Sequence, residues 1–148
     1  MRIYLDVCCL CRPFDDLMQD RVQFESDAVL AIISRCLTGN WELVSSEAID
    51  LELSKLQNRD KIEKVLKLYS VAESRLVLCD RSIRRVEELQ LQGIKLYDSL
   101  HLALAEVSGV DALLTTDDAF LRMAKKLVSG IVVNNPVDWL MEVLRSER

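Results

Sequence analysis

Short apolar runs alternate with helical patterns along the whole chain, and this alternation limits the possible folds more than any other feature. Five runs have the length and composition of β-strands, over residues 2–5, 41–45, 76–79, 112–115 and 131–133. The segments between them are long enough for right-handed crossover connections. The pattern predicts an α/β fold, a three-layer α/β/α sandwich with a mostly parallel five-stranded sheet.

Composition favours a single domain over residues 1–148. The chain is 50% apolar, and only four Gly and two Pro interrupt it, which is not typical of a disordered chain or a long linker. Its net charge of −5 gives no general basic surface, so nucleic acid would have to bind a local patch. Five cysteines without a charged-then-apolar leader predict free thiols in a cytoplasmic protein. No apolar run approaches the ~20 residues of a membrane span.

Helical spacing places the helices between these strands. The predicted helices cover residues 22–37, 46–58, 59–73, 80–91, 98–108 and 118–127, with a last helix from Pro136. In the first of them, Phe24, Ala28 and Ile32 recur at helical spacing, and Glu25 falls among the polar positions between them.

Four acidic residues occupy positions that the predicted topology makes informative. Asp6 and Asp117 follow the first and fourth strands, and parallel strands bring their carboxyl ends to one edge of the sheet. Asp98 starts a helix that is apolar on nearly every side. Taking Ile49, Leu53 and Leu56 as the buried stripe of their helix, Glu52 lies roughly 60° from it, closer than Asp50 or Glu47. We therefore expect Glu52 to be the acid that borders the core there.

Four converging carboxylates would need a cation. Burying an unpaired carboxylate costs several kcal/mol, and two carboxylates a few ångströms apart repel by roughly 3 kcal/mol. Oxygen ligands without His or thiolate suit Mg²⁺ or Mn²⁺, which can activate water for phosphodiester hydrolysis. The alternative is that each acid is a helix cap or a solvated charge. Spacing alone leaves both interpretations open.

Four motifs then carry a family resemblance. YLDVCCL near the start, SSEAIDLEL, YDSLHLALA and LLTTDDAF occur in this order over nearly the whole chain, which resembles the PIN-domain nucleases, including the VapC-type toxins of toxin–antitoxin pairs. The opening D-x-C-C-x-x-R-P-F-D-D is similar to that of a subgroup of this family.

The resemblance implies a Mg²⁺- or Mn²⁺-dependent endoribonuclease. It places the catalytic, metal-binding acids at Asp6, Glu52, Asp98 and Asp117, with Asp118 as a helper or a cap. It also implies an RNA substrate, an antitoxin partner and a homodimer. One position departs from the family pattern, because Cys8 stands where Asn or Ser is common. The alternative hypothesis is accordingly a non-catalytic PIN-like scaffold with a degenerate metal site that binds a protein. A receiver- or phosphatase-type domain is a weaker rival, because the first strand ends in the single acid Asp6.

The cysteines, His101 and Arg12 are not assigned to the predicted site. Cys8, Cys9 and Cys11 have no second ligand pair to complete a zinc site, so we expect free thiols in the core or a loop. His101 is expected to be a packed helix histidine, with a supporting role beside Asp98 as the alternative. Arg12 could contact a phosphate or belong to a turn, and the sequence does not decide between these.

Overall fold

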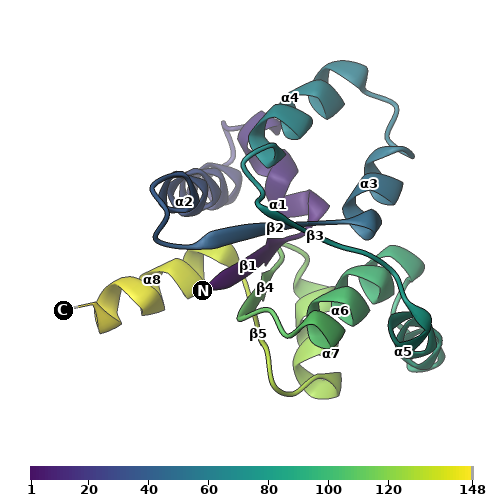
Figure 1. Ribbon diagram of the computed structural model, residues 1–148. Helices are drawn as coiled ribbons and strands as arrows, with labels where there is room; N and C mark the ends of the chain where they lie inside the picture. The colour runs from purple at the N-terminus through teal and green to yellow at the C-terminus, as the bar shows by residue number, and fades with distance from the viewer. Residues whose placement is uncertain (148) are drawn as a thin grey trace.

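The structure is a parallel five-stranded sheet with helices on both faces. It is a computed structural model that describes residues 1–147. The strands are β1 (Arg2–Leu5), β2 (Glu42–Ser46), β3 (Ser74–Leu76), β4 (Ala112–Leu114) and β5 (Val132–Asn134). They pair in parallel in the order β3-β2-β1-β4-β5, as Figure 1 shows. The predicted α/β/α class and five-stranded parallel sheet are confirmed.

The helices divide between the two faces of this sheet. They are α1 (Val7–Cys11), α2 (Asp20–Leu37), α3 (Glu47–Leu53), α4 (Arg59–Tyr69), α5 (Asp80–Leu91), α6 (Leu96–Ser108), α7 (Asp118–Leu127) and α8 (Pro136–Ser146), with a 3₁₀ turn at Arg12–Phe14. In Figure 1, α1, α2 and α4 lie on one face and α5, α6 and α7 on the other. No helix within residues 1–147 is both long and apolar enough to cross a membrane.

This strand order creates a switch point between β1 and β4. The chain runs outward from β1 to β3, then returns to β4 on the other side of β1. In open α/β sheets, ligands bind outside the carboxyl ends of the strands at such a point. The residues that follow β1 and β4 are therefore the first place to look for a site.

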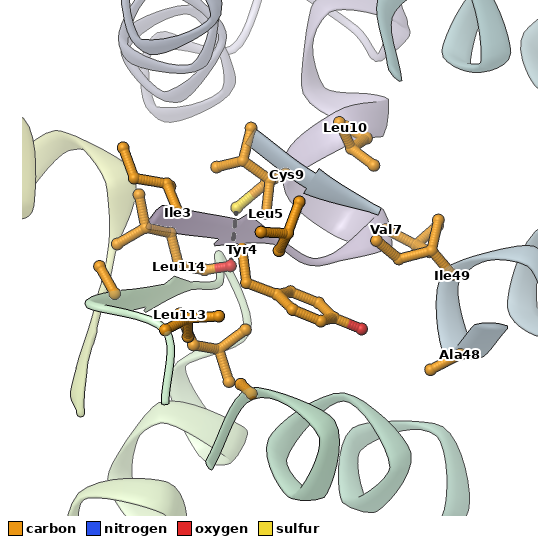
Figure 2. Packing of buried hydrophobic residues seen from close by; sticks show 14 of the residues in the cluster. Ile3, Tyr4, Leu5, Val7, Cys9, Leu10, Ala48, Ile49, Leu113 and Leu114 are labelled. Carbon is orange, nitrogen blue, oxygen red and sulfur yellow. Dashed lines mark hydrogen bonds between the residues drawn. The ribbon is translucent and has the colours of Figure 1, made fainter. Parts of the chain in front are cut away.

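The central strands are buried on both sides, as their apolar composition predicts. Ile3, Tyr4 and Leu5 are at most 1% exposed, as are Leu113 and Leu114. Figure 2 shows Ile3 and Leu5 on one side of β1 and Tyr4 on the other. The rigid core thus fixes the strand ends on which the site is built.

Several predicted boundaries are wrong. The helix predicted over 59–73 ends at Tyr69 and the helix predicted from residue 22 begins at Asp20, whereas local caps account for some of the other differences. The third strand comprises Ser74–Leu76, since Leu78 N–H donates to the Glu47 carboxylate at 2.9 Å and Cys79 starts α5. The helix predicted over 46–58 ends at Leu53, before Asn58 caps α4. The helix predicted from Asp98 begins at Leu96. Short α1 was not predicted, and the Asp6 side chain caps it.

The buried face of α2 also differs from the prediction. Phe24 is 61% exposed, whereas Glu25 is 1% exposed. The inner face instead follows Val22, Val29 and Ile32, which brings Glu25 inward. This rotation is possible because Glu25 meets a set of hydrogen-bond donors in the interior.

Candidate metal centre

Asp6 lies in the first position after β1 and is 3% exposed. Its backbone N–H donates to Leu114 O at 3.2 Å, which joins it to the end of β4. Its Oδ1 accepts the Cys9 N–H at 3.0 Å and the Cys8 thiol at 2.8 Å. Burial raises the pKa of the Asp6 carboxyl well above its usual range. Both of these hydrogen bonds use Oδ1 and neither uses Oδ2.

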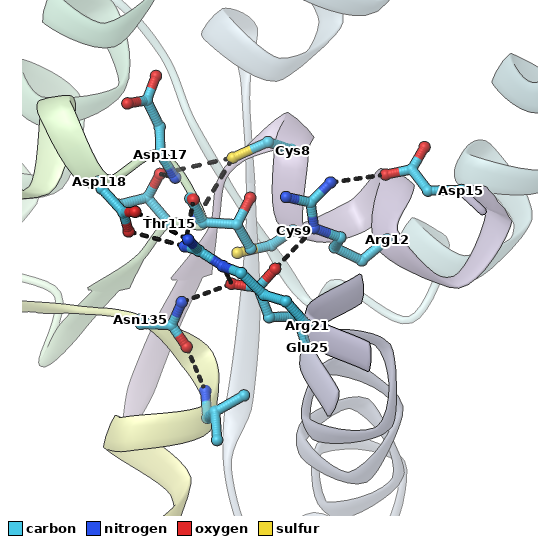
Figure 3. Close-up of polar contacts among 12 residues, drawn as sticks. Cys8, Cys9, Arg12, Asp15, Arg21, Glu25, Thr115, Asp117, Asp118 and Asn135 are labelled. Atoms are coloured by element: carbon cyan, nitrogen blue, oxygen red, sulfur yellow. Dashed lines mark hydrogen bonds and ion pairs between the residues drawn. The ribbon is translucent and has the colours of Figure 1, made fainter. Parts of the chain in front are cut away.

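The loop after β4 presents Asp117 beside this position. Asp117 caps α7, with Oδ1 accepting the Phe120 N–H at 3.1 Å, and its own N–H donates to Thr115 Oγ1 at 3.1 Å. Thr116 N–H donates to Cys8 Sγ at 3.4 Å, so Cys8 ties the two strand ends together (Figure 3). Asp117 is exposed, which corrects the expectation that its carboxylate is buried.

Asp98 enters from the first turn of α6 and is half-buried. Its pKa is raised to about 6, first by burial and then by the negative charges of Asp6 and Asp117, with a smaller effect from Glu52. Asp98 and Asp117 line the same small cavity of about 80 Å³. The structure therefore brings Asp6, Asp98 and Asp117 into electrostatic contact from three different elements.

Glu52 reaches the same region but is held by a histidine. Its Oε1 lies 2.7 Å from Nε2 of His101, which is 1% exposed. Nδ1 of His101 lies 2.6 Å from the Tyr4 hydroxyl, and this hydroxyl lies 2.6 Å from Ser46 Oγ. His101 is the packed helix histidine that the sequence predicts, and its ring contacts Glu52 and not Asp98. Glu47, Asp50 and Glu52 are all partly exposed, so Glu52 is distinguished by this contact and not by burial.

One direction of proton donation satisfies every group in this chain of hydrogen bonds. Ile49 N–H donates to Ser46 Oγ at 3.1 Å. Ser46 then donates to Tyr4, Tyr4 to His101 Nδ1, and His101 Nε2–H to the Glu52 carboxylate. Tyr4 and Ser46 were missed from the sequence, where the only sign is a tyrosine in an otherwise apolar buried strand, whose hydroxyl needs a partner.

Replacing Tyr4 with Phe is expected to destabilise the protein by about 1–3 kcal/mol, because buried Ser46 and His101 each lose a partner. Urea unfolding monitored by circular dichroism measures this change. Tyr97→Phe is the matched control, since Tyr97 is only partly buried and its hydroxyl makes none of the side-chain hydrogen bonds found in residues 1–147. Equal stabilities of the two variants would contradict the role given to the Tyr4 hydroxyl.

Buried Glu25 shows how this fold treats an acid that is only structural. Its carboxylate receives Arg12 Nε at 2.9 Å, Arg21 Nε at 3.2 Å and Asn135 Nδ2 at 2.6 Å (Figure 3). Asp6, Asp98 and Asp117 differ, because none of them belongs to an ion pair within residues 1–147. No Lys or Arg of residues 1–147 neutralises their negative charges.

Removing the Glu25 carboxylate should be costly. Glu25→Ala leaves Arg12 and Asn135 without their buried acceptor, and we expect the free energy of unfolding to fall by about 2–4 kcal/mol. This is less than the full effect of breaking a buried ion pair, because the arginines are partly solvated. Urea unfolding checks this value. Asp27→Ala on the exposed face of α2 is the control and should change stability little. A similar loss in both variants would contradict the buried network.

The set of donors fits a hard divalent cation. Burial and the neighbouring carboxylates raise the pKa of Asp98, and no Lys or Arg within residues 1–147 pairs with these three acids. Carboxylate oxygens are the ligands that Mg²⁺ and Mn²⁺ prefer. Among residues 1–147, the one group of three or more His, Cys, Asp and Glu residues whose ligand atoms all lie within 4.8 Å of one another is Asp6, Cys8 and Cys9. The four predicted acids are thus more widely spaced than that group.

Residues near the site have the following arrangement. All five cysteines are free thiols, as predicted, and Cys79 is the exposed one. Arg12 pairs with Glu25 and Asp15 beside the turn, and it does not border the acids. Asp118 turns toward Arg21, with Oδ1 2.7 Å from Nη2, whereas Asp117 points away from it (Figure 3). A cleft of about 370 Å³ runs past Glu52 and Cys8 to Asp15 and Lys61.

The same architecture recurs in solved structures of low sequence identity. VapBC2 from Rickettsia felis, solved with a DNA fragment from its promoter, superposes with a TM-score of 0.58 at 16% identity over 91% of this chain and 98% of that chain. FitAcB from Neisseria gonorrhoeae gives 0.55 at 16% over 90% and 97%. PAE2754 from Pyrobaculum aerophilum gives 0.55 at 18% over 99% of both chains. No curated protein matched the sequence.

The sequence itself matches a family model. The PIN domain model aligns with residues 3–126, which include β1 to β4 and every acid considered above. Strand β5 and helix α8 lie beyond the match but complete the same fold, with β5 pairing to β4. The chain therefore belongs to the PIN domain family.

Proposed function

We propose that the protein is a Mg²⁺- or Mn²⁺-dependent endoribonuclease and the toxin of a toxin–antitoxin pair. One observation carries the catalytic part: Asp6, Asp98 and Asp117 lie near one another at the switch point and none of them pairs with a Lys or Arg of residues 1–147. Burial, together with the charges of Asp6 and Asp117, raises the pKa of Asp98 to about 6. A buried acid with a structural role, Glu25, has two arginines instead.

Each residue has a role in the proposed reaction. Asp6, Asp98 and Asp117 would hold the cation, which when bound supplies an activated water and neutralises charge on the phosphodiester. Glu52 Oε1 is occupied by His101, so Oε2 is the oxygen available to orient the attacking water or take its proton. The bond from phosphorus to the water oxygen forms while the bond to the leaving ribose oxygen breaks. The Tyr4–His101 chain keeps Glu52 in place.

The toxin assignment rests on similarity. The motifs of the chain resemble VapC-type toxins, and the fold is similar to VapBC2, which was solved with promoter DNA. We therefore propose an antitoxin protein as partner and a homodimer in a cytoplasmic setting. Copurification with the product of a small adjoining reading frame would support this part, and a chain that expresses without growth inhibition or partner would contradict it.

A cleavage assay tests the catalytic part. Purified protein is incubated with a fluorescently end-labelled single-stranded RNA, and with DNA of the same sequence, in Mn²⁺, in Mg²⁺ and in EDTA. We expect internal cuts of the RNA with metal and none in EDTA. Because an RNA of unsuitable sequence would escape cleavage, a total cellular RNA pool is used alongside. Cleavage that persists in EDTA would contradict the metal requirement. RNA that stays intact in both the labelled substrate and the cellular pool, with Mn²⁺ bound, would favour the non-catalytic scaffold.

A further inference from the structure

We propose that Cys8 Sγ is itself a ligand of the cation, which makes the centre a mixed oxygen–sulfur site that also takes thiophilic divalent ions such as Cd²⁺ and Zn²⁺. The inference rests on the proposed function, since it assumes that the acids hold a metal ion. It concerns the position where this chain departs from its family, with a thiol two residues after Asp6.

The position of the sulfur supports direct ligation. Cys8 Sγ lies 2.8 Å from Asp6 Oδ1, and Asp6, Cys8 and Cys9 form a group whose ligand atoms all lie within 4.8 Å of one another. Cys9, the third member, is fully buried, and its thiol donates to Leu114 O at 3.3 Å. Cys8 is only partly buried and lines the same cleft as Glu52. Cys8 is therefore the sulfur that an ion entering from solvent can reach.

The charges around Asp6 support the same conclusion. Asp6 is 3% exposed, and the weakly donating Cys8 thiol lies 2.8 Å from its Oδ1. An incoming ion would take the place of the thiol proton between sulfur and carboxylate. The S–H bond breaks, the proton passes to the buffer, and a metal–sulfur bond forms without oxidation. Thiolate selects softer ions, so affinity should rise from Mg²⁺ through Mn²⁺ to Zn²⁺ and Cd²⁺.

Cadmium absorption measures the sulfur contact without any activity assay. Full-length protein carrying Cys79→Ser, which removes the exposed thiol, is titrated with Cd²⁺ alone while near-ultraviolet sulfur-to-metal charge-transfer absorption is recorded. The matched variant adds Cys8→Ser, whose hydroxyl still donates to Asp6. Mn²⁺ binding is measured on both proteins by calorimetry.

We expect a saturable absorption band in the Cys79→Ser protein and its loss when Cys8 is also Ser. Mn²⁺ should still bind when Cys8 is Ser, since the carboxylate oxygens that suit Mn²⁺ remain. A band that persists without Cys8, or no band in a protein that binds Mn²⁺, would overturn the inference and leave the proposed function intact. Uptake of neither Cd²⁺ nor Mn²⁺ would overturn both.

Discussion

Replacing Asp117 with Asn is expected to reduce metal-dependent RNA cleavage by more than about 100-fold. Asp117 is the acid after β4 that shares a cavity with Asp98, and losing a ligand should cost more than the 10–100-fold typical of residues that merely support one. The fold should remain, because Asn is as good a helix cap as Asp and can still accept the Phe120 N–H. Initial cleavage rates at saturating Mn²⁺ measure the effect.

The neighbouring residue supplies the matched control. Asp118→Asn removes one negative charge from the same turn, but Asp118 is exposed and pairs with Arg21 away from the acids. We expect its cleavage rate to stay within about tenfold of wild type, as for a surface charge outside the site. Equal losses in the two variants would mean that the turn is only a charged surface. A larger loss in Asp118→Asn would move the proposed ligand by one residue.

Replacing Asp98 with Asn is expected to abolish cleavage and yet stabilise the metal-free protein. The folded state holds the pKa of Asp98 at about 6, above the ordinary 3.8, so its ionised form is penalised by burial and by Asp6 and Asp117. That shift corresponds to about 1–3 kcal/mol after allowing for partial exposure. The acid gains at most ~1 kcal/mol from the N-terminus of α6, so the penalty dominates. Thermal unfolding in EDTA at pH 7.5 measures the gain.

The same shift sets the pH dependence of this effect. Between pH 3.8 and about 6 the folded protein holds the Asp98 proton more tightly than the unfolded chain, so stability falls as pH rises through this window. The gain from Asp98→Asn should be full above pH 6 and vanish near pH 4. Asp138→Asn, at the start of α8, is a control that lies in a first helical turn outside the site. A variant less stable than wild type at pH 7.5 in EDTA would contradict the charge crowding.

The sequence predicted the parts of the structure that follow from periodicity. Apolar runs and helical spacing were sufficient for the parallel sheet, and the topology placed Asp6 and the residues after β4 at one edge. Element ends were less predictable, because single side chains decide them, as Asp6 does for α1 and Asn58 for α4. In the sequence, an acid that caps a helix cannot be told from a solvated acid, because capping depends on where the backbone N–H groups lie.

Buried polar partners were the least predictable part of the site. Glu25 was assigned to the polar positions of its helix, because its three donors come from positions 12, 21 and 135. The hydrogen bonds from Ser46 through Tyr4 and His101 to Glu52 likewise join four separate segments. Such contacts depend on tertiary packing, which no local pattern encodes. For this reason the sequence singled out Glu52 but did not predict its hydrogen bond to His101.

Calorimetric titration with Mn²⁺ tests most directly whether these acids form a metal centre. Wild-type protein should show saturable binding, and the double variant Asp98→Asn/Asp117→Asn should show none while its circular dichroism spectrum is unchanged. The same binding in the double variant, or no binding in wild type, would contradict the assignment of Asp6, Glu52, Asp98 and Asp117 as a metal site.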